Sequence, residues 1–304
     1  MREPELLLRH EPPVSVAAGI PVDRRRVRDG LVPRGRTSSS ALALNRLGPR
    51  ADSTRVNLAF AAVLAAPGLA VGSFLNVIAS RVPLRLPIGT SRSRCMSCNH
   101  ELSARDNIPL VSYALLRGNC RYCSASIPWR YPAVEAVTAL LVAACGIRFG
   151  VSAEAFVAAG FCIVLVVISA IDIEYRIVPN RIVVPAAAVV LVAQTLIYPS
   201  PEWVLAALGA SGFLLAAALA YPKGMGMGDV KLALLLGAML GRNVTAALMI
   251  GFFAALVPAA ILALRHGSRV RKIAIPFAPF LALGAIVALF FGDTILDWYL
   301  GIFG

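Results

Sequence analysis

The sequence has 304 residues, of which 58% are hydrophobic and only 15% are charged, and its mean hydropathy is +0.75. This composition excludes an ordinary soluble enzyme and predicts an all-α polytopic membrane protein. The formal net charge is +13, and much of it lies in an N-terminal tail and in loops. Contact with anionic lipids can account for this charge, so we expect no nucleic-acid partner.

Residues 1–55 form a basic extension that contains eleven arginines. Its richness in Arg, Pro and Ser and its low aromatic content predict disorder. It lacks the apolar segment of a secretory signal peptide. A single crossing by residues 56–80 would place this tail on the side opposite the other basic loops. Three explanations stay open: the tail is translocated despite its charge, the first apolar run is not a simple crossing, or the natural start lies further downstream.

Eight uncharged apolar runs predict about eight transmembrane helices. Five runs have about 20 residues, which is the length that crosses the hydrocarbon core, and a sixth is near the lower limit. Two runs are too short alone. They are spans only if Glu135 or residues 226–231 enter the bilayer against protein or a polar cavity. The runs cover residues 56–80, 136–147, 155–171, 182–201, 203–222, 232–241, 243–264 and 273–292.

The distribution of basic residues predicts the orientation. If residues 81–131 are cytoplasmic, the loops on that side hold sixteen basic residues, whereas the opposite side holds only Arg148 and Arg242. Basic loops remain in the cytoplasm. This orientation places Asp172 and Asp229 at the cytoplasmic face.

Residues 81–132, between the first two spans, form a predicted cytoplasmic loop with two CxxC pairs. The pairs are Cys95 with Cys98 and Cys120 with Cys123. Two such turns predict a tetrahedral four-thiolate zinc site of the structural kind. Disulfides are the alternative, but thiols are kept reduced in the cytoplasm. A loop of this size buries too little apolar surface to stabilise itself, which favours a structural metal.

Other residues near the cysteines have supporting roles in this interpretation. Arginines at positions 92, 94, 117 and 121 can offset the negative charge of four thiolates. His100 follows Cys98 closely, but four sulfurs already fill a tetrahedral site, so we expect His100 to face solvent. Cys145 and Cys162 lie inside apolar runs, which is typical of small core residues.

Two aspartates stand at the edges of apolar segments. Asp172 directly follows the run 155–171, and Asp229 ends the glycine-rich segment 224–228. An ionisable group at a membrane boundary is costly, which indicates a functional role. Two adjacent carboxylates can share one proton, so that one acts as general base on a water while the other polarises a carbonyl. This pair predicts peptide-bond hydrolysis, and the glycines beside Asp229 leave room for an extended substrate.

Less specific interpretations of these aspartates exist. Each could cap a helix or pair with Arg176 or Lys231. The chain could instead be an ion- or proton-coupled transporter that uses membrane-edge carboxylates. A transporter would carry such acids near the bilayer midplane, whereas these lie beside loops. A non-enzymatic assembly factor would leave both aspartate motifs unexplained.

Taken together, these motifs resemble the type IV prepilin peptidase family. Residues 72–77 resemble its N-terminal signature, and the segment that holds the two CxxC pairs resembles its cytoplasmic loop. Residues 172–180 resemble the first catalytic aspartate motif, residues 226–231 the GxGD motif, and residues 275–280 a further family segment. The resemblance covers residues 72–292. An alternative with the same protease chemistry but a different target is an intramembrane GxGD protease of the presenilin type. Those proteases lack the paired CxxC loop, so this chain favours the prepilin peptidase family.

The resemblance implies a membrane aspartic endopeptidase in the inner or cytoplasmic membrane, with its active site facing the cytoplasm and residues 133–304 as its peptidase core. Its partners would be membrane lipids and a prepilin or pseudopilin, whose leader peptide it removes. Many family members also methylate the new N-terminus with S-adenosylmethionine, but no glycine-rich fingerprint identifies the residues that would bind this cofactor. The residues expected at the site are catalytic Asp172 and Asp229, with Glu174, Gly226, Gly228 and Lys231 in substrate-binding or tuning roles.

Overall fold

The structure is a computed structural model that describes residues 50–89, 93–221, 225–266 and 275–303. The predicted disorder of residues 1–49 and the role expected of Arg92 therefore lie outside the described residues. Within them, the secondary structure is helical, and extended pairing is limited to two isolated bridges. This confirms the predicted all-α class.

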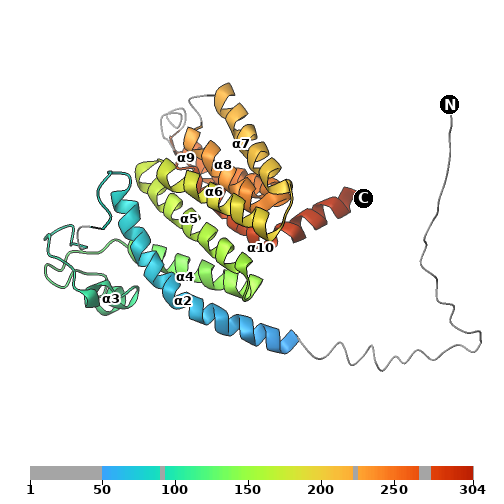
Figure 1. The fold of residues 1–304 in the computed structure, drawn as a ribbon. Coiled ribbons are helices and arrows are strands. Elements are labelled where there is room, and N and C mark those ends of the chain that lie inside the picture. The colour runs from blue at the N-terminus through green and yellow to red at the C-terminus, as the bar shows by residue number, and fades with distance from the viewer. Residues whose placement is uncertain (1–49, 90–92, 222–224, 267–274, 304) are drawn as a thin grey trace, which may run out of the picture. The chain divides into compact units, whose positions relative to one another are not determined.

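Eight of the helices have fourteen or more residues, and shorter helical turns join them (Figure 1). The elements are α2 (Arg50–Arg81), η1 (Ala104–Asn107), α3 (Val111–Leu115), α4 (Arg130–Phe149), α5 (Ala153–Tyr175), α6 (Asn180–Ile197), α7 (Glu202–Ala220), α8 (Met227–Leu240), η2 (Gly241–Asn243), α9 (Val244–His266) and α10 (Ala278–Phe303).

Seven helical stretches in the described part of the chain are long and apolar enough to cross a membrane. One of them, Met227–Arg265, contains both α8 and α9, which the sequence predicted as separate spans. The two short runs are lengthened as expected, because α4 takes in Glu135 and α8 takes in Asp229. The first helix starts at Arg50, six residues earlier than predicted. The chain is therefore a multi-pass membrane protein.

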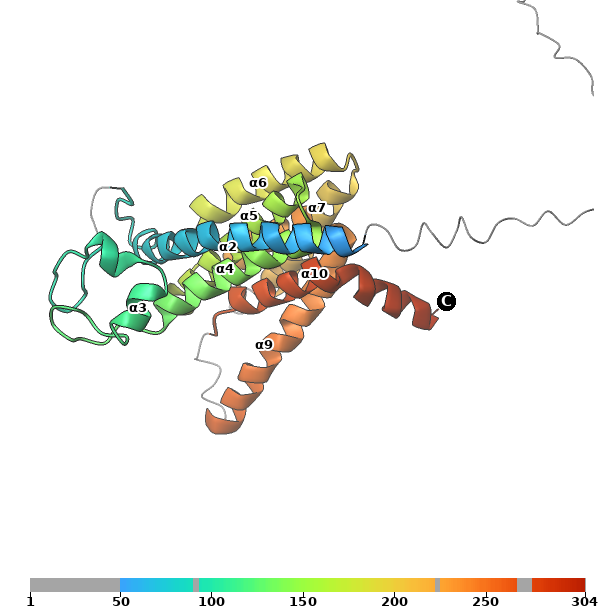
Figure 2. The ribbon, with the colours of Figure 1, turned by 90° about the horizontal axis from the view of Figure 1, so that it is seen from below.

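Neighbouring helices pack in pairs: α2 against α4, α7 against α8, and α9 against α10. Glycines allow these close approaches. A Cβ atom on Gly72 of α2 would lie 2.7 Å from the Cα of Glu135 in α4, so only glycine fits there. Figure 2 shows the second half of α9 leaving the bundle, and side chains such as Leu256 and Leu264 are exposed there.

Helices α5 and α8 supply most of the large side chains that are fully buried. Helix α5 lies between α4 and α6 (Figure 1) and also contacts α2 and α10, whereas α8 contacts α6, α7 and α10. Asp172 lies near the end of α5, and Asp229 lies in the first turn of α8. The best-packed helices of the protein therefore hold the two aspartates in place. Their large buried side chains are Phe161, Leu165, Ile168 and Ile171 of α5 and Leu232, Leu235 and Leu236 of α8.

Candidate active site

Asp172 joins the end of α5 to the start of α10. Its side chain is buried, and its Oδ2 atom accepts a hydrogen bond of 3.1 Å from the backbone N–H of Ala278. Ala278 is the first residue of α10, where backbone N–H groups have no partner inside the helix. The carboxyl group of Asp172 is thus held by a helix N-terminus.

Asp229 lies in the first turn of α8, where it is partly buried and interacts electrostatically with Asp172. The two glycines before it have different surroundings. A Cβ atom on Gly228 would lie 2.8 Å from the Cβ of Val178, so this position is needed for close packing. A Cβ on Gly226 would first meet the Oδ2 of Asp229, at 3.6 Å. The room predicted beside Asp229 therefore exists at Gly226, whereas Val178 fills it at Gly228.

Asp172 has one of the simple structural roles considered above, because its carboxyl group accepts a hydrogen bond from the start of α10, whereas Asp229 does not cap α8. The N-cap of α8 is Gly226, and this helix end has no side-chain cap hydrogen bond. Lys231 donates from Nζ to Oδ1 of Asn180 at 2.9 Å, which ties α8 to the start of α6. Among the described residues, the ion pairs do not include one between Asp172 and Arg176. The two carboxyl groups interact electrostatically, and a pair of carboxyl groups that share one proton can activate a water.

Glu174 faces away from this pair. Two residues along a helix correspond to a rotation of about 200°, so Glu174 lies on nearly the opposite side of α5 from Asp172. It forms an ion pair with Arg130, the first residue of α4. Glu174 is therefore placed to join α5 to α4 rather than to act beside Asp172.

The four cysteines predicted as ligands lie together at one site. The Sγ atoms of Cys95, Cys98, Cys120 and Cys123 are all within 4.8 Å of one another, and such a group could hold a metal ion. All four are free thiols. His100 is not part of this group; its ring stacks on Tyr122, with the ring centroids 3.7 Å apart.

The two CxxC turns have the same construction, offset by 25 residues. Asn99 and Ser124, which follow the second cysteine of each turn, both have a φ of 58°. The isolated bridges Arg94↔Glu101 and Asn119↔Ser126 flank the two turns at the same offset. Sequence reading missed this repeat, although the equal spacing of the CxxC pairs contains it. Each turn therefore presents two sulfurs from an equivalent backbone frame.

Backbone N–H groups favour the thiolate form at one of these cysteines. Hydrogen bonds from the N–H groups of Cys98 and then Ser97 lower the pKa of Cys95 to about 6. At Cys123 the N–H of Ala125 acts in the same direction, but burial and the neighbouring sulfurs outweigh it and raise the pKa to about 12. A cation among the four sulfurs would favour the thiolate form at every position, because metal ions bind cysteine as the thiolate.

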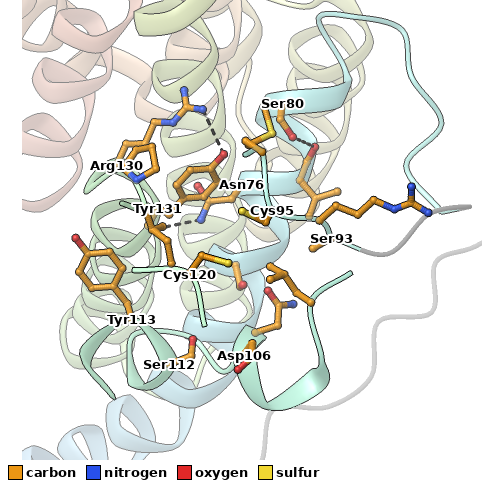
Figure 3. Close-up of a pocket in the computed structure, with 18 of the residues that line it drawn as sticks. Asn76, Ser80, Ser93, Cys95, Asp106, Ser112, Tyr113, Cys120, Arg130 and Tyr131 are labelled. Atoms are coloured by element: carbon orange, nitrogen blue, oxygen red, sulfur yellow. Dashed lines mark hydrogen bonds between the residues drawn. The ribbon is translucent and has the colours of Figure 1, made fainter. Parts of the chain in front are cut away.

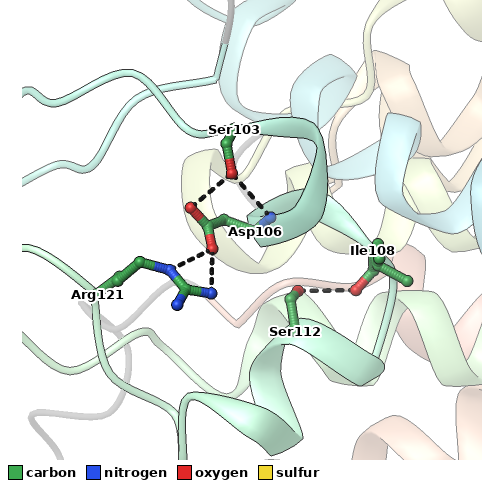
Figure 4. A network of polar contacts seen from close by, with 5 residues as sticks. All are labelled: Ser103, Asp106, Ile108, Ser112 and Arg121. Carbon is green, nitrogen blue, oxygen red and sulfur yellow. Dashed lines mark hydrogen bonds and ion pairs between the residues drawn. The ribbon is translucent and has the colours of Figure 1, made fainter.

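A buried carboxylate, Asp106, links η1 to the second CxxC turn (Figure 4). It accepts hydrogen bonds of 2.8 Å from the Ser103 hydroxyl and from the guanidinium of Arg121. The Ser103 hydroxyl and then Arg121 hold the pKa of Asp106 below its usual range. Asp106 had no motif to mark it in the sequence, because its partners depend on how the loop folds.

Two of the loop arginines have carboxylate partners that the sequence did not indicate. Arg121 lies between Cys120 and Cys123 but pairs with Asp106, and Arg94 pairs with Glu101 at 2.7 Å. A carboxylate is a stronger partner for a guanidinium than a more distant thiolate, because the pair forms charge-assisted hydrogen bonds. These two arginines stabilise the loop fold through their carboxylate partners.

A pocket of about 600 Å³ lies between this loop and helices α2, α4 and α5 (Figure 3). Asn76 donates to the backbone oxygen of Tyr131 at 3.1 Å, and Arg130 donates to the Tyr131 hydroxyl at 3.3 Å. Glu135 also lines the pocket and accepts a hydrogen bond from the N–H of Leu110. Glu174 and Tyr175 bring the end of α5 to this pocket, so the pocket and Asp172 lie on different faces of one helix end.

Comparison with known proteins gives consistent matches. Residues 67–149 match the family described as bacterial Peptidase A24 N-terminal domain, and residues 159–264 match the type IV leader peptidase family. The second match contains both aspartates.

Curated relatives cover most of the chain. A protein of Bacillus subtilis (strain 168), named prepilin leader peptidase/N-methyltransferase, is 39% identical over 77% of this chain and 95% of its own length. Proteins with the same name from Burkholderia pseudomallei (strain 1026b) and Stutzerimonas stutzeri are 33% and 34% identical, over 79% and 80% of this chain and 87% and 94% of their own lengths. No solved structure matches.

Proposed function

Because this chain belongs to the type IV leader peptidase family, we propose that Asp172 and Asp229 are the catalytic pair with which it removes the leader peptide of type IV prepilins or pseudopilins. The chain is a membrane peptidase that can also be a methyltransferase. The proximity of two carboxyl groups, one at the end of α5 and one at the start of α8, carries the proposal. No relative reported above is a transporter.

In the proposed reaction, the pair shares one proton. The N–H of Ala278 donates to Asp172 and so favours its carboxylate form, which makes Asp172 the general base and Asp229 the protonated acid. Asp172 takes a proton from water as the water oxygen bonds to the scissile carbonyl carbon, and Asp229 gives its proton to the carbonyl oxygen. The C–N bond then breaks as the amine takes the proton held by Asp172, and the diol returns the other proton to Asp229.

The substrate strand lies beside Gly226 in this proposal. Gly226 is exposed and has open space next to Asp229, so an extended backbone can approach the carboxyl groups. The excess of basic loop residues on the same side supports a site at the cytoplasmic face of the inner or cytoplasmic membrane. Lys231 and Gly228 then act on the start of α8 rather than on the substrate.

Zinc is the metal that fits the cysteine cluster best. Tetrahedral Zn²⁺ with bonds of about 2.3 Å places its sulfurs about 3.8 Å apart. The Sγ atoms of Cys95 and Cys123 lie 3.8 Å apart, on different CxxC turns. Because four sulfurs close the coordination sphere, we assign zinc a structural role.

The pocket beneath the cysteine loop fits S-adenosylmethionine by its chemistry and volume. Glu135 and Glu174 would face the cationic groups of the cofactor, and Tyr131 and Tyr175 offer aromatic surfaces to its adenine and sulfonium. When bound, S-adenosylmethionine supplies an activated methyl group for the new N-terminus. Arg130 holds Glu174 in position at the pocket.

Replacing each aspartate tests the pair. Full-length Asp172→Asn and Asp229→Asn variants, co-expressed with a prepilin, should lose leader removal by at least about 10³-fold, measured by mass spectrometry of the pilin N-terminus. Glu174→Gln should cost less than about tenfold, and Asp297→Asn, at an exposed position in α10, should cost nothing. Cleavage that survives in either aspartate variant would remove that residue from the pair.

A further inference from the structure

A second pocket, of about 330 Å³, lies at the other end of the bundle from the aspartates. It is lined by residues from the end of α4, the start of α5 and the end of α8, whereas Asp172 ends α5 and Asp229 begins α8. Residues of α6, α7, η2 and α10 complete it. The pocket therefore lies where membrane-crossing helices meet the opposite bilayer surface.

Two buried oxygen atoms in this pocket lack partners. Gln194 is only 2% exposed, and its Oε1 has no hydrogen bond, while its Nε2 contacts the Sδ and the carbonyl oxygen of Met239. The Oδ1 of Asn243 is also buried without a partner, while its Nδ2 donates to Asp293 at 2.9 Å. Flipping either amide would place its oxygen against another acceptor. Both oxygens therefore lack a donor within the protein, and a water or a ligand group that enters the pocket can supply one.

The charges around these oxygens indicate what kind of donor it is. Glu154, Glu202 and Asp293 line the pocket, together with Arg148 and Arg242. The three carboxylates each have one interaction within the protein. Glu154 accepts a hydrogen bond from the Tyr198 hydroxyl, Glu202 accepts one from the backbone N–H of Arg242, and the Asp293 carboxylate lies 3.7 Å from the Arg242 guanidinium. The carboxylates favour a cationic donor, and the arginines favour an anion beside it.

A bare divalent cation fits less well. Among the described residues, three or more metal-ligating side chains lie close enough to share an ion at the cysteine cluster. The carboxylates of this pocket do not form such a group. The arginines would also repel a cation. A zwitterion with separate positive and negative ends matches the mixture of charges.

We propose that this pocket binds the headgroup of an aminophospholipid. Its primary ammonium would donate to the amide oxygens of Gln194 and Asn243, and its phosphate would face Arg148 or Arg242. The pocket opens at the depth where headgroups lie, because it is built from the ends of membrane helices. This inference is independent of the proposed peptidase chemistry.

Native mass spectrometry of the full-length protein with added lipids tests the inference. Phosphatidylethanolamine should bind at least about tenfold more tightly than phosphatidylcholine or phosphatidylglycerol with the same acyl chains, because only its ammonium offers N–H donors. Gln194→Leu and Asp293→Asn should each reduce this preference to less than about threefold.

Asp297→Asn is the matched control, since Asp297 lies one turn beyond Asp293 in α10 but does not line the pocket. It should keep the full preference. If Gln194→Leu fails to fold, Asp293→Asn alone decides, because Asp293 is 61% exposed and its replacement leaves the core intact. Equal binding of the three lipids, or a preference unchanged in Asp293→Asn, would overturn the inference. Equally tight binding of soluble phosphoethanolamine would overturn the assignment to a lipid.

Discussion

The cysteine loop and the aspartate pair are held in place by different forces. Between residues 82 and 129, Cys120 and Asp106 are the buried residues among those that the structure describes. The loop therefore relies on its cysteine cluster and a few polar contacts. The aspartates instead occupy the ends of α5 and α8, which carry the large buried side chains of the core.

This difference separates two kinds of perturbation. Loss of the metal should disorder the loop and spare the helices, because the helices do not depend on it for burial. A small change in helix packing should move the aspartates and spare the loop. The predictions below use this separation, beginning with the largest effect.

Metal removal should have the largest effect. Chelation should unfold the loop and make the backbone at Arg105 and Arg117, which are already exposed, flexible enough for trypsin to cut, because structural zinc contributes about 10–16 kcal/mol in zinc-finger peptides and the loop buries little else. Mass spectrometry of the digest would locate the cuts, and circular dichroism would show whether the helices persist. Cys120→Ser should reproduce the result, whereas Cys162→Ala, a buried cysteine outside the loop, should retain the metal. A loop that stays resistant after chelation would contradict the structural role.

Gly228→Ala should disturb the aspartate pair without affecting the loop. The new Cβ would lie 2.8 Å from the Cβ of Val178, so the start of α8 must shift and carry Asp229 with it. A displacement of about 1 Å can cost about 10²-fold in rate. Prepilin cleavage kinetics and metal content, measured on the same preparation, would show whether only cleavage falls.

Two other glycines sharpen this test. Gly212→Ala, in α7, enters open space and should change nothing. Gly226→Ala creates only an ordinary contact inside the protein, at 3.6 Å from the Asp229 carboxylate. Any loss of activity in this variant should therefore come from poorer substrate binding, which raises KM more than it lowers kcat. Equal rates for Gly228→Ala and the wild type would mean that the helix start tolerates the methyl group.

Asp106→Asn should have the smallest effect and should be confined to the loop. It weakens the charge-assisted bonds to Ser103 and Arg121, at a cost of about 1–3 kcal/mol because Arg121 is half exposed. The folded pKa of Asp106 is lowered, so its stabilisation is complete above its unfolded pKa of about 4 and is lost only as pH falls through the lower folded value.

The stability difference between Asp106→Asn and wild type should therefore be constant from about pH 8 to pH 6, where the carboxylate is fully ionised. Hydrogen exchange of the metal-loaded loop would measure it. A difference that changes within this interval would point to another titrating group. Asp297→Asn, far from the loop in sequence, should leave the exchange of the loop unchanged.

Sequence alone predicts the helices, the cysteine cluster and the residues of the candidate site, because each has a local signal. Apolar runs mark the spans, paired CxxC turns mark the ligands, and isolated acids at the ends of apolar runs mark Asp172 and Asp229. The short apolar run 136–147 could span the membrane only if Glu135 belonged to the same helix, and the structure places Glu135 in α4.

Contacts between distant segments were beyond sequence reading. The bond from Ala278 to Asp172 joins residues 106 positions apart, and nothing near either residue encodes it. The pairing of Arg121 with Asp106 was likewise missed, because the nearest negative groups along the chain are the cysteines. Gln194 and Asn243 have no local sequence signal, since a single amide near a helix end forms no recognisable motif.

The length of α8 has a consequence for the membrane itself. A helix of 14 residues is about 21 Å long, roughly 9 Å less than a typical bilayer's hydrophobic thickness. Such a hydrophobic mismatch is relieved by local thinning of the bilayer around the short helix. Because Asp229 lies in the first turn of α8, local thinning of the bilayer at this end of the helix would shorten the distance between its carboxyl group and bulk solvent.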